Sequence, residues 1–114
     1  MVAEALLAVM AVLELSLLNF KVPVVIREDY TMLLELHDNL IWFHTDVRKW
    51  TPTVKAKYLE DLNLLQHLVS VPLVAIAHTD NKKLVKFGKS IGFEFKQDFI
   101  NQDNQMYHIY SRSL

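Results

Sequence analysis

The chain alternates between stretches whose apolar residues have helical spacing and stretches with strand-like patterns. Residues 2–19 are rich in Ala, Leu and Met, contain no Pro or Gly, and predict a helix. The polar side chains Glu4, Glu14 and Ser16 do not share one helical face, so this helix is apolar almost all round. That pattern is typical of an element buried in the core or covered by a partner.

A short strand and a hairpin are expected next. Residues 24–26 follow Pro23 and predict a strand. Residues 33–44 predict a β-hairpin around Asp38 and Asn39, because both residue types tolerate the left-handed conformation that a two-residue turn requires.

The turn fixes which residues of the hairpin face each other. It pairs Leu36 with Ile41 and Leu34 with Phe43 on one face, and Glu35 with Trp42 and Leu33 with His44 on the other. The competing interpretation is a helix over residues 28–39, because Met32, Leu33 and Leu36 also fit a period of 3.6 residues.

Stronger signals follow Trp50. Thr51 and Pro52 predict the start of a helix that ends near Val69. Four apolar residues recur along it at helical spacing, namely Val54, Tyr58, Leu62 and Leu65. Residues 72–78 form a short apolar run after a proline, which predicts a strand covered on both faces.

The last third of the chain predicts a helix and a hairpin. Asp80 is the expected cap of a helix over residues 81–91, which Gly92 ends. Residues 93–99 and 105–111 predict two strands around the polar turn 101–104. The order β-α-β-α-β-β points to an α/β sheet with a terminal hairpin.

Composition limits the classes of site that this protein can carry. The chain has 114 residues, enough for one domain, and only two glycines, so a Gly-rich phosphate loop is excluded. It has no cysteine, which excludes disulfides and thiolate metal sites. The formal net charge of −1 gives no reason to expect a nucleic-acid partner.

The apolar amino-terminal stretch lacks the features of a targeting or membrane segment. No Lys or Arg precedes it, and no small-residue cleavage site of a secretory signal is evident. Its two glutamates make a membrane span costly. We therefore expect a cytoplasmic protein with no membrane partner.

Residues 81–93, with the sequence NKKLVKFGKSIGF, resemble the last helix of the GNAT N-acetyltransferases. As in that family, the segment follows a short apolar strand and precedes a hairpin. The resemblance covers residues 40–112 and implies a mixed α/β sheet with flanking helices and a carboxy-terminal hairpin. Within the family it is most similar to the reduced GNAT-like proteins of tailed bacteriophages, which implies a phage protein.

The resemblance also implies an acetyl-CoA site, in which the diphosphate lies on backbone N–H groups at a helix start. The family loop has Arg or Gln, two residues, Gly, one residue, then Gly or Ala. Here Arg48 matches, but Thr51 and Thr53 occupy the small positions and Pro52 lacks an N–H group. If acetyl-CoA binds, the residues implied are Arg48, Lys49, Thr51, Thr53 and Asn81.

The family's usual catalytic acid is also missing. Many members use a tyrosine in the last helix to protonate the departing thiolate, and that position is Gly88 here. His44 is the one candidate for a catalytic residue, as a general base on the strand that lines the acceptor site in the family. The other charged clusters, including Glu60 with Asp61 and the lysines of residues 82–89, are expected to be solvated helix faces.

No metal site is expected from the five histidines, because HxH and HxxxH spacings are absent. His44 and Asp46 would share a strand face and are the best pair available.

We expect one domain over residues 1–114, made of the apolar helix of residues 1–20 and the GNAT-like core. The leading hypothesis is a catalytically degenerate GNAT-like protein without a cofactor, acting as an interaction or assembly module of a phage, in the virion or the host cytoplasm. Its partner, another protein or a second copy, would bind through residues 2–19. The alternative is an acetyl-CoA-dependent N-acetyltransferase with an atypical loop.

Overall fold

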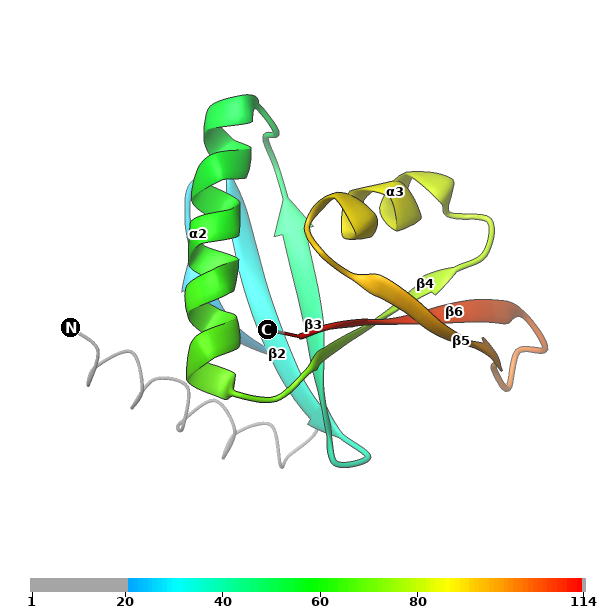
Figure 1. The fold of residues 1–114 in the computed structure, drawn as a ribbon. Helices are drawn as coiled ribbons and strands as arrows, with labels where there is room; N and C mark the ends of the chain where they lie inside the picture. The colour runs from blue at the N-terminus through cyan, green and yellow to red at the C-terminus, as the bar shows by residue number, and fades with distance from the viewer. Residues whose placement is uncertain (1–20, 114) are drawn as a thin grey trace.

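The computed structural model describes residues 21–113, which form one six-stranded sheet and two helices (Figure 1). In chain order the elements are β1 (Val22–Ile26), β2 (Tyr30–His37), β3 (Leu40–Val47), α2 (Pro52–Val69), β4 (Leu73–His78), α3 (Lys82–Ser90), β5 (Glu94–Ile100) and β6 (Met106–Arg112). The sheet order is β1-β2-β3-β4-β6-β5, and only the β3–β4 pair is parallel. The mixed α/β sheet with a carboxy-terminal hairpin is as predicted. The apolar helix expected over residues 2–19 lies outside the described residues.

The β2–β3 hairpin has the predicted register. Leu36 faces Ile41 and Leu34 faces Phe43, while Glu35 faces Trp42 and Leu33 faces His44. Asp38 and Asn39 both have positive φ, at 53° and 60°, as a two-residue turn of this type requires. The competing helix over residues 28–39 is therefore wrong, because the alternation of buried and half-buried residues along β2 has a period of two.

The α2 helix begins and ends where its sequence indicates. The Thr51 hydroxyl accepts a hydrogen bond from the backbone N–H of Val54 at 3.1 Å, and Pro52 is the first helical residue. The expected apolar positions, Val54, Tyr58, Leu62 and Leu65, are all buried. Ser70 ends the helix in the left-handed conformation.

Two details of the second half differ from the sequence prediction. The cap of α3 is Asn81 rather than Asp80: its side-chain oxygen accepts from the N–H of Leu84 at 3.1 Å. The predicted covering of both faces of β4 is wrong in part, because Ile76 in the middle of the strand is 37% exposed. Continuous apolar runs do not distinguish a fully covered strand from one that borders an opening.

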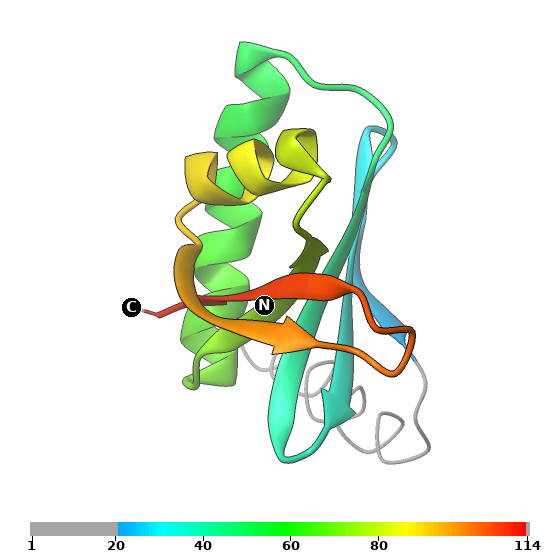
Figure 2. The same cartoon turned by 90° about the vertical axis from the view of Figure 1, so that its right-hand side faces the viewer.

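Both helices lie on the same face of the sheet (Figures 1 and 2). Tyr58 of α2 and Phe87 of α3 meet edge to face, with ring centroids 5.8 Å apart. The core lies between this helical layer and the sheet, and Tyr30, Met32 and Leu62 are among its fully buried members.

Asp61 is not on a solvated face, contrary to the prediction for the Glu60–Asp61 pair. Its carboxylate accepts two hydrogen bonds from Arg27 at 3.0 Å and one from the Tyr30 hydroxyl, and its side chain is only 11% exposed. Burial by itself would raise the pKa of Asp61, but the bonds from Arg27 and Tyr30 outweigh it and hold the pKa below its ordinary value. The Arg27–Asp61 ion pair therefore links the β1–β2 turn to α2.

Neither described helix combines the length and the hydrophobicity that crossing a membrane would require.

Candidate functional site

The sheet opens between β3 and β4. These strands pair only at Ile41 with Leu73 and at Trp42 with Val74, both near the strand starts. Beyond that point β3 continues toward Val47 beside β2, whereas β4 continues beside β6. Figure 1 shows the two halves of the sheet diverging, with β3 upright and β4 turning aside.

A cavity of about 380 Å³ occupies this opening. Its lining is mainly apolar and comes from both halves of the sheet and from α3, and includes Leu33, Phe43, His44, Thr45, Ala75, Ile76, Ala77, Leu84, Val85, Phe87, Gly88, Ile91, Phe93 and Tyr110. A volume of this size, mostly apolar with a few polar groups, is typical of small-molecule sites.

Lys21, His44 and Thr45 are polar residues of the cavity lining, and the His44 ring is hydrogen-bonded to a carboxylate. Its Nε2 lies 2.9 Å from Oε1 of Glu35, which is on the neighbouring strand and on the same sheet face. Burial lowers the pKa of His44, and the hydrogen bond with Glu35 offsets only part of that effect. Because a carboxylate only accepts hydrogen bonds, the neutral ring donates through Nε2 and keeps Nδ1 as its basic nitrogen.

Asp46, which was the best candidate to pair with His44 at a metal site, forms an ion pair with Arg48 instead. Its carboxylate accepts from Arg48 at 2.8 Å. Between residues 21 and 113 no three His, Asp or Glu side chains come together in a way that would hold a metal ion.

Gly88 lies on the cavity wall, where the resemblance implied a tyrosine. A Cβ placed there would meet only the Phe93 Cβ, at 3.9 Å, so no packing constraint requires glycine. A tyrosine does line the cavity, but it is Tyr110 on β6. Sequence reasoning missed Tyr110 and Glu35 as site residues, although the predicted hairpin register already placed Glu35 on the same face as His44.

A second groove, of about 430 Å³, lies between the segment that precedes α2 and the start of α3. It brings together three of the five residues expected to bind a cofactor, Arg48, Lys49 and Asn81, with Lys83 and Trp50 at its edge. Thr51 and Thr53 are not among its lining residues. Trp50 packs against Tyr58 and Phe87, with ring centroids 5.3 Å and 5.0 Å away, and thus fills space between the two helices.

In three of the first four residues of α2, the backbone N–H group is missing or already bonded. Pro52 has no N–H group, and the N–H groups of Val54 and Lys55 donate to the side-chain and backbone oxygens of Thr51 at 3.1 and 2.8 Å. Within residues 21–113, the N–H group of Thr53 is the remaining donor of these four that has no acceptor. These residues do not fit a diphosphate, which needs several convergent N–H groups.

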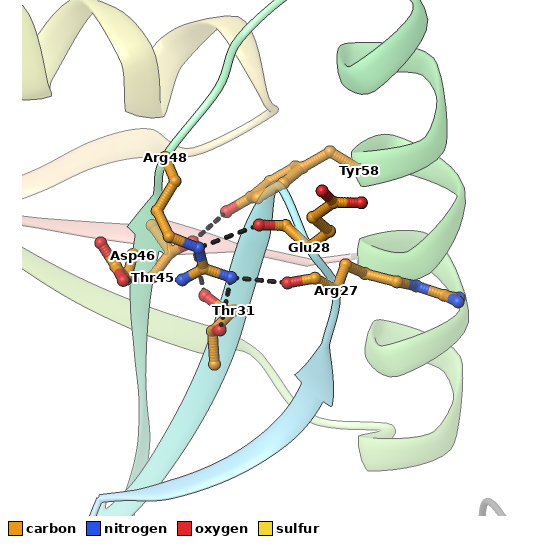
Figure 3. A network of polar contacts seen from close by, with 7 residues as sticks. All are labelled: Arg27, Glu28, Thr31, Thr45, Asp46, Arg48 and Tyr58. Carbon is orange, nitrogen blue, oxygen red and sulfur yellow. Dashed lines mark hydrogen bonds and ion pairs between the residues drawn. The ribbon is translucent and has the colours of Figure 1, made fainter.

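The Arg48 guanidinium also makes its hydrogen bonds within the protein (Figure 3). It donates to the carbonyl oxygens of Arg27 and Glu28 at 2.5 and 3.0 Å, to the Thr31 hydroxyl at 3.1 Å, and to Asp46. Figure 3 shows this guanidinium surrounded by oxygens of the β1–β2 turn and of β3. Arg48 therefore clamps the turn, and the cationic side chains left at the groove are the exposed Lys49 and Lys83.

Comparison with solved structures shows which fold this is. The chain is similar to a putative GnaT-family acetyltransferase from Bordetella pertussis, with a TM-score of 0.59 and 15% identity over 75% of this chain. It is also similar to a GCN5-related N-acetyltransferase from Brucella melitensis, with a TM-score of 0.50 and 17% identity over 73% of this chain. The fold is GNAT-like.

The likeness covers only part of those enzymes. The chain spans 57% of the Bordetella protein and 43% of the Brucella protein. No family model and no curated protein matches the sequence.

Proposed function

We propose that this chain is a GNAT-fold binding module that does not use acetyl-CoA. The observation that carries the proposal is the start of α2, where Pro52 lacks an N–H group and Thr51 accepts the N–H groups of Val54 and Lys55. A diphosphate at this point would have to displace the helix cap, which is itself stabilising by about 1 kcal/mol.

Two further features support the same proposal. The Arg48 guanidinium makes four hydrogen bonds within the protein, so moving it onto a phosphate would release the β1–β2 turn. Gly88 supplies no proton donor at the cavity wall.

Calorimetric titration with acetyl-CoA of the wild type and of a restored-loop variant tests the proposal. Thr51→Gly with Pro52→Ala and Thr53→Ala adds an N–H group at position 52 and frees that of Val54, while glycine keeps most of the cap's stability. We expect measurable affinity in the variant and a Kd above about 1 mM in the wild type. Micromolar binding by the wild type would contradict the proposal.

The second candidate is an N-acetyltransferase with an atypical loop. It is favoured by the GNAT-like fold, by the groove that joins Arg48, Lys49 and Asn81, and by the His44–Glu35 pair at the cavity. A neutral His44 could accept the proton of an amine through Nδ1, with Glu35 fixing the ring. Release of free thiol from acetyl-CoA in the presence of peptide and polyamine amines, abolished in His44→Ala, would establish this candidate. We expect no release above the buffer rate.

The partner in the leading proposal is a protein bound through residues 2–19, either another chain or a second copy. The apolar composition of that segment supports this part of the proposal. The mass from light scattering distinguishes the two partners: a second copy predicts a dimer or larger species for the full chain and a monomer after Leu7→Glu with Val12→Glu, whereas a different protein as partner predicts a monomer for both. A role in a phage virion or in the host cytoplasm rests on the sequence resemblance of residues 81–93.

A further inference from the structure

A basic groove borders α3 next to the cavity, with which it shares Val85 and Tyr110 as lining residues. It has a volume of about 520 Å³ and is lined by Thr79, Lys82, Val85, Lys86, Lys89, Phe95, His108 and Tyr110. Lys82, Lys86 and Lys89, here called the basic row, recur at the spacing that places side chains on one helical face. All three are exposed.

The basic row has no counter-charge of its own. Among the described residues, no carboxylate lies within ion-pair distance of any of the three lysines. Asp98, on β5, is instead bonded to Nδ1 of His108 at 2.7 Å. Three like charges on one face repel each other, and an anionic partner would relieve this repulsion.

The opposite wall of the groove is aromatic. Phe95 is 49% exposed and packs edge to face on His108 and Tyr110, with ring centroids 5.1 and 6.0 Å away. Because Phe95 packs against these rings and is still about half exposed to solvent, it offers an apolar contact surface beside the lysines.

Phe95 belongs to the edge strand of the sheet. Strand β5 pairs only with β6, and every one of its residues is exposed. Its outer backbone N–H and C=O groups therefore have no partner strand among the described residues, which makes them available to an added strand. Phe99 and Ile100, at 40% and 61% exposure, continue the apolar character of this edge.

We propose that the basic row and the β5 edge form a docking surface for an acidic, extended polypeptide segment of a partner protein. Carboxylates of the segment would pair with the lysines, an apolar side chain would rest on Phe95, and the segment backbone would extend the sheet at β5. A nucleic acid matches the lysines and Phe95, but its phosphate backbone lacks the alternating N–H and C=O groups that pair with a strand edge. The net charge of −1 does not attract it either. The inference goes beyond the proposed function, since it holds whether or not acetyl-CoA binds between β3 and β4.

The experiment uses the full chain and a fluorescein-labelled peptide in which glutamate alternates with valine, followed by fluorescence anisotropy. We expect Lys82→Glu with Lys86→Glu and Lys89→Glu to weaken peptide binding at least about tenfold at low salt. Lys86→Glu is compared with Lys83→Glu, a matched charge reversal on the same helix but outside the basic groove, which should leave the affinity unchanged. A peptide methylated at alternate backbone nitrogens should bind more weakly if it adds a strand to β5.

The proposal is overturned if the acidic peptide does not bind, if Lys83→Glu weakens binding as much as Lys86→Glu, or if N-methylation has no effect. Tighter binding of a single-stranded oligothymidine than of the acidic peptide also overturns it, in favour of a nucleic-acid surface. None of these readings depends on acetyl-CoA, so failure here is distinguishable from failure of the proposed function.

Discussion

Replacing Arg48 with alanine tests whether this side chain is a structural clamp rather than a cofactor ligand. The change removes hydrogen bonds to the carbonyl oxygens of Arg27 and Glu28, to the Thr31 hydroxyl and to Asp46. The Arg48 side chain is 41% exposed, so water can replace some of its hydrogen bonds in the variant. Each bond therefore contributes near the lower end of the usual range of about 0.5–1.5 kcal/mol. We therefore expect a loss of about 1–2 kcal/mol in the free energy of unfolding.

Thermal unfolding followed by circular dichroism measures this loss. An unfolding entropy of roughly 2.1 cal/mol/K per residue converts it to a fall in Tm of about 4–8 °C for a chain of this size. Lys49→Ala is the matched control, because its exposed side chain makes no hydrogen bond or ion pair with any other residue between 21 and 113. It should change the free energy of unfolding by less than about 0.5 kcal/mol. If Arg48→Ala had the same Tm as Lys49→Ala, Arg48 would not be a structural clamp, and its guanidinium would be available to bind a ligand at the groove.

Three further predictions concern the fold. Gly92→Ala should lower the free energy of unfolding by at least about 1–2 kcal/mol, because residue 92 has φ of +98° and the new Cβ would lie 3.0 Å from Nε of Arg112. Gly88→Ala in α3 should instead raise it by up to about 1 kcal/mol, and denaturant midpoints compare the two variants. The pKa of Asp61 is lower in the folded than in the unfolded chain, so the ionised carboxylate stabilises the fold fully above pH ~4, and this stabilisation is lost as pH falls through the folded-state pKa. Asp61→Asn should therefore flatten the acid side of a plot of Tm against pH. An unchanged acid side would contradict the role given to Asp61. Asn39→Gly should raise Tm slightly, because residue 39 has φ of 60° in the hairpin turn, and a lower Tm would argue against that turn.

Local sequence signals were sufficient for much of this fold. The Asp38-Asn39 turn set the β2–β3 register residue by residue, because a two-residue loop leaves only one way for the flanking strands to pair. Thr51-Pro52 and the apolar spacing set the start and the buried face of α2. Both predictions needed only neighbours in sequence.

Contacts between distant segments could not be read in the same way. Asp61 is bonded to Arg27 and Tyr30, more than thirty residues away, so its adjacency to Glu60 suggested solvent exposure instead. Buried Arg112 donates to the Ile91 carbonyl at 2.8 Å and to Asn63, a contact between β6, the end of α3 and α2 that no local pattern indicates. The divergence of β3 from β4, which creates the cavity, is likewise a property of the whole sheet.

The sequence named residues for the candidate site, and their role stays a prediction. The structure places three of the five implied cofactor residues, Arg48, Lys49 and Asn81, around one groove. The hydrogen bonds that occupy the side chains of Arg48 and Asn81 were not predictable, because they depend on where the β1–β2 turn and α3 lie in space. The basic row was visible as a cluster of lysines, but its proximity to Phe95 depends on β5 folding back beside α3.

The N–H groups at the start of α2 decide whether this protein can bind the diphosphate of acetyl-CoA. Backbone amide chemical shifts of isotopically labelled protein, titrated with acetyl-CoA, report on Thr51, Thr53, Val54 and Lys55 individually. We predict no saturable shift at these four amides up to about 1 mM ligand, a binding free energy weaker than roughly −4 kcal/mol. Saturable shifts at these amides with a micromolar Kd would contradict the account and establish the helix start as a cofactor site.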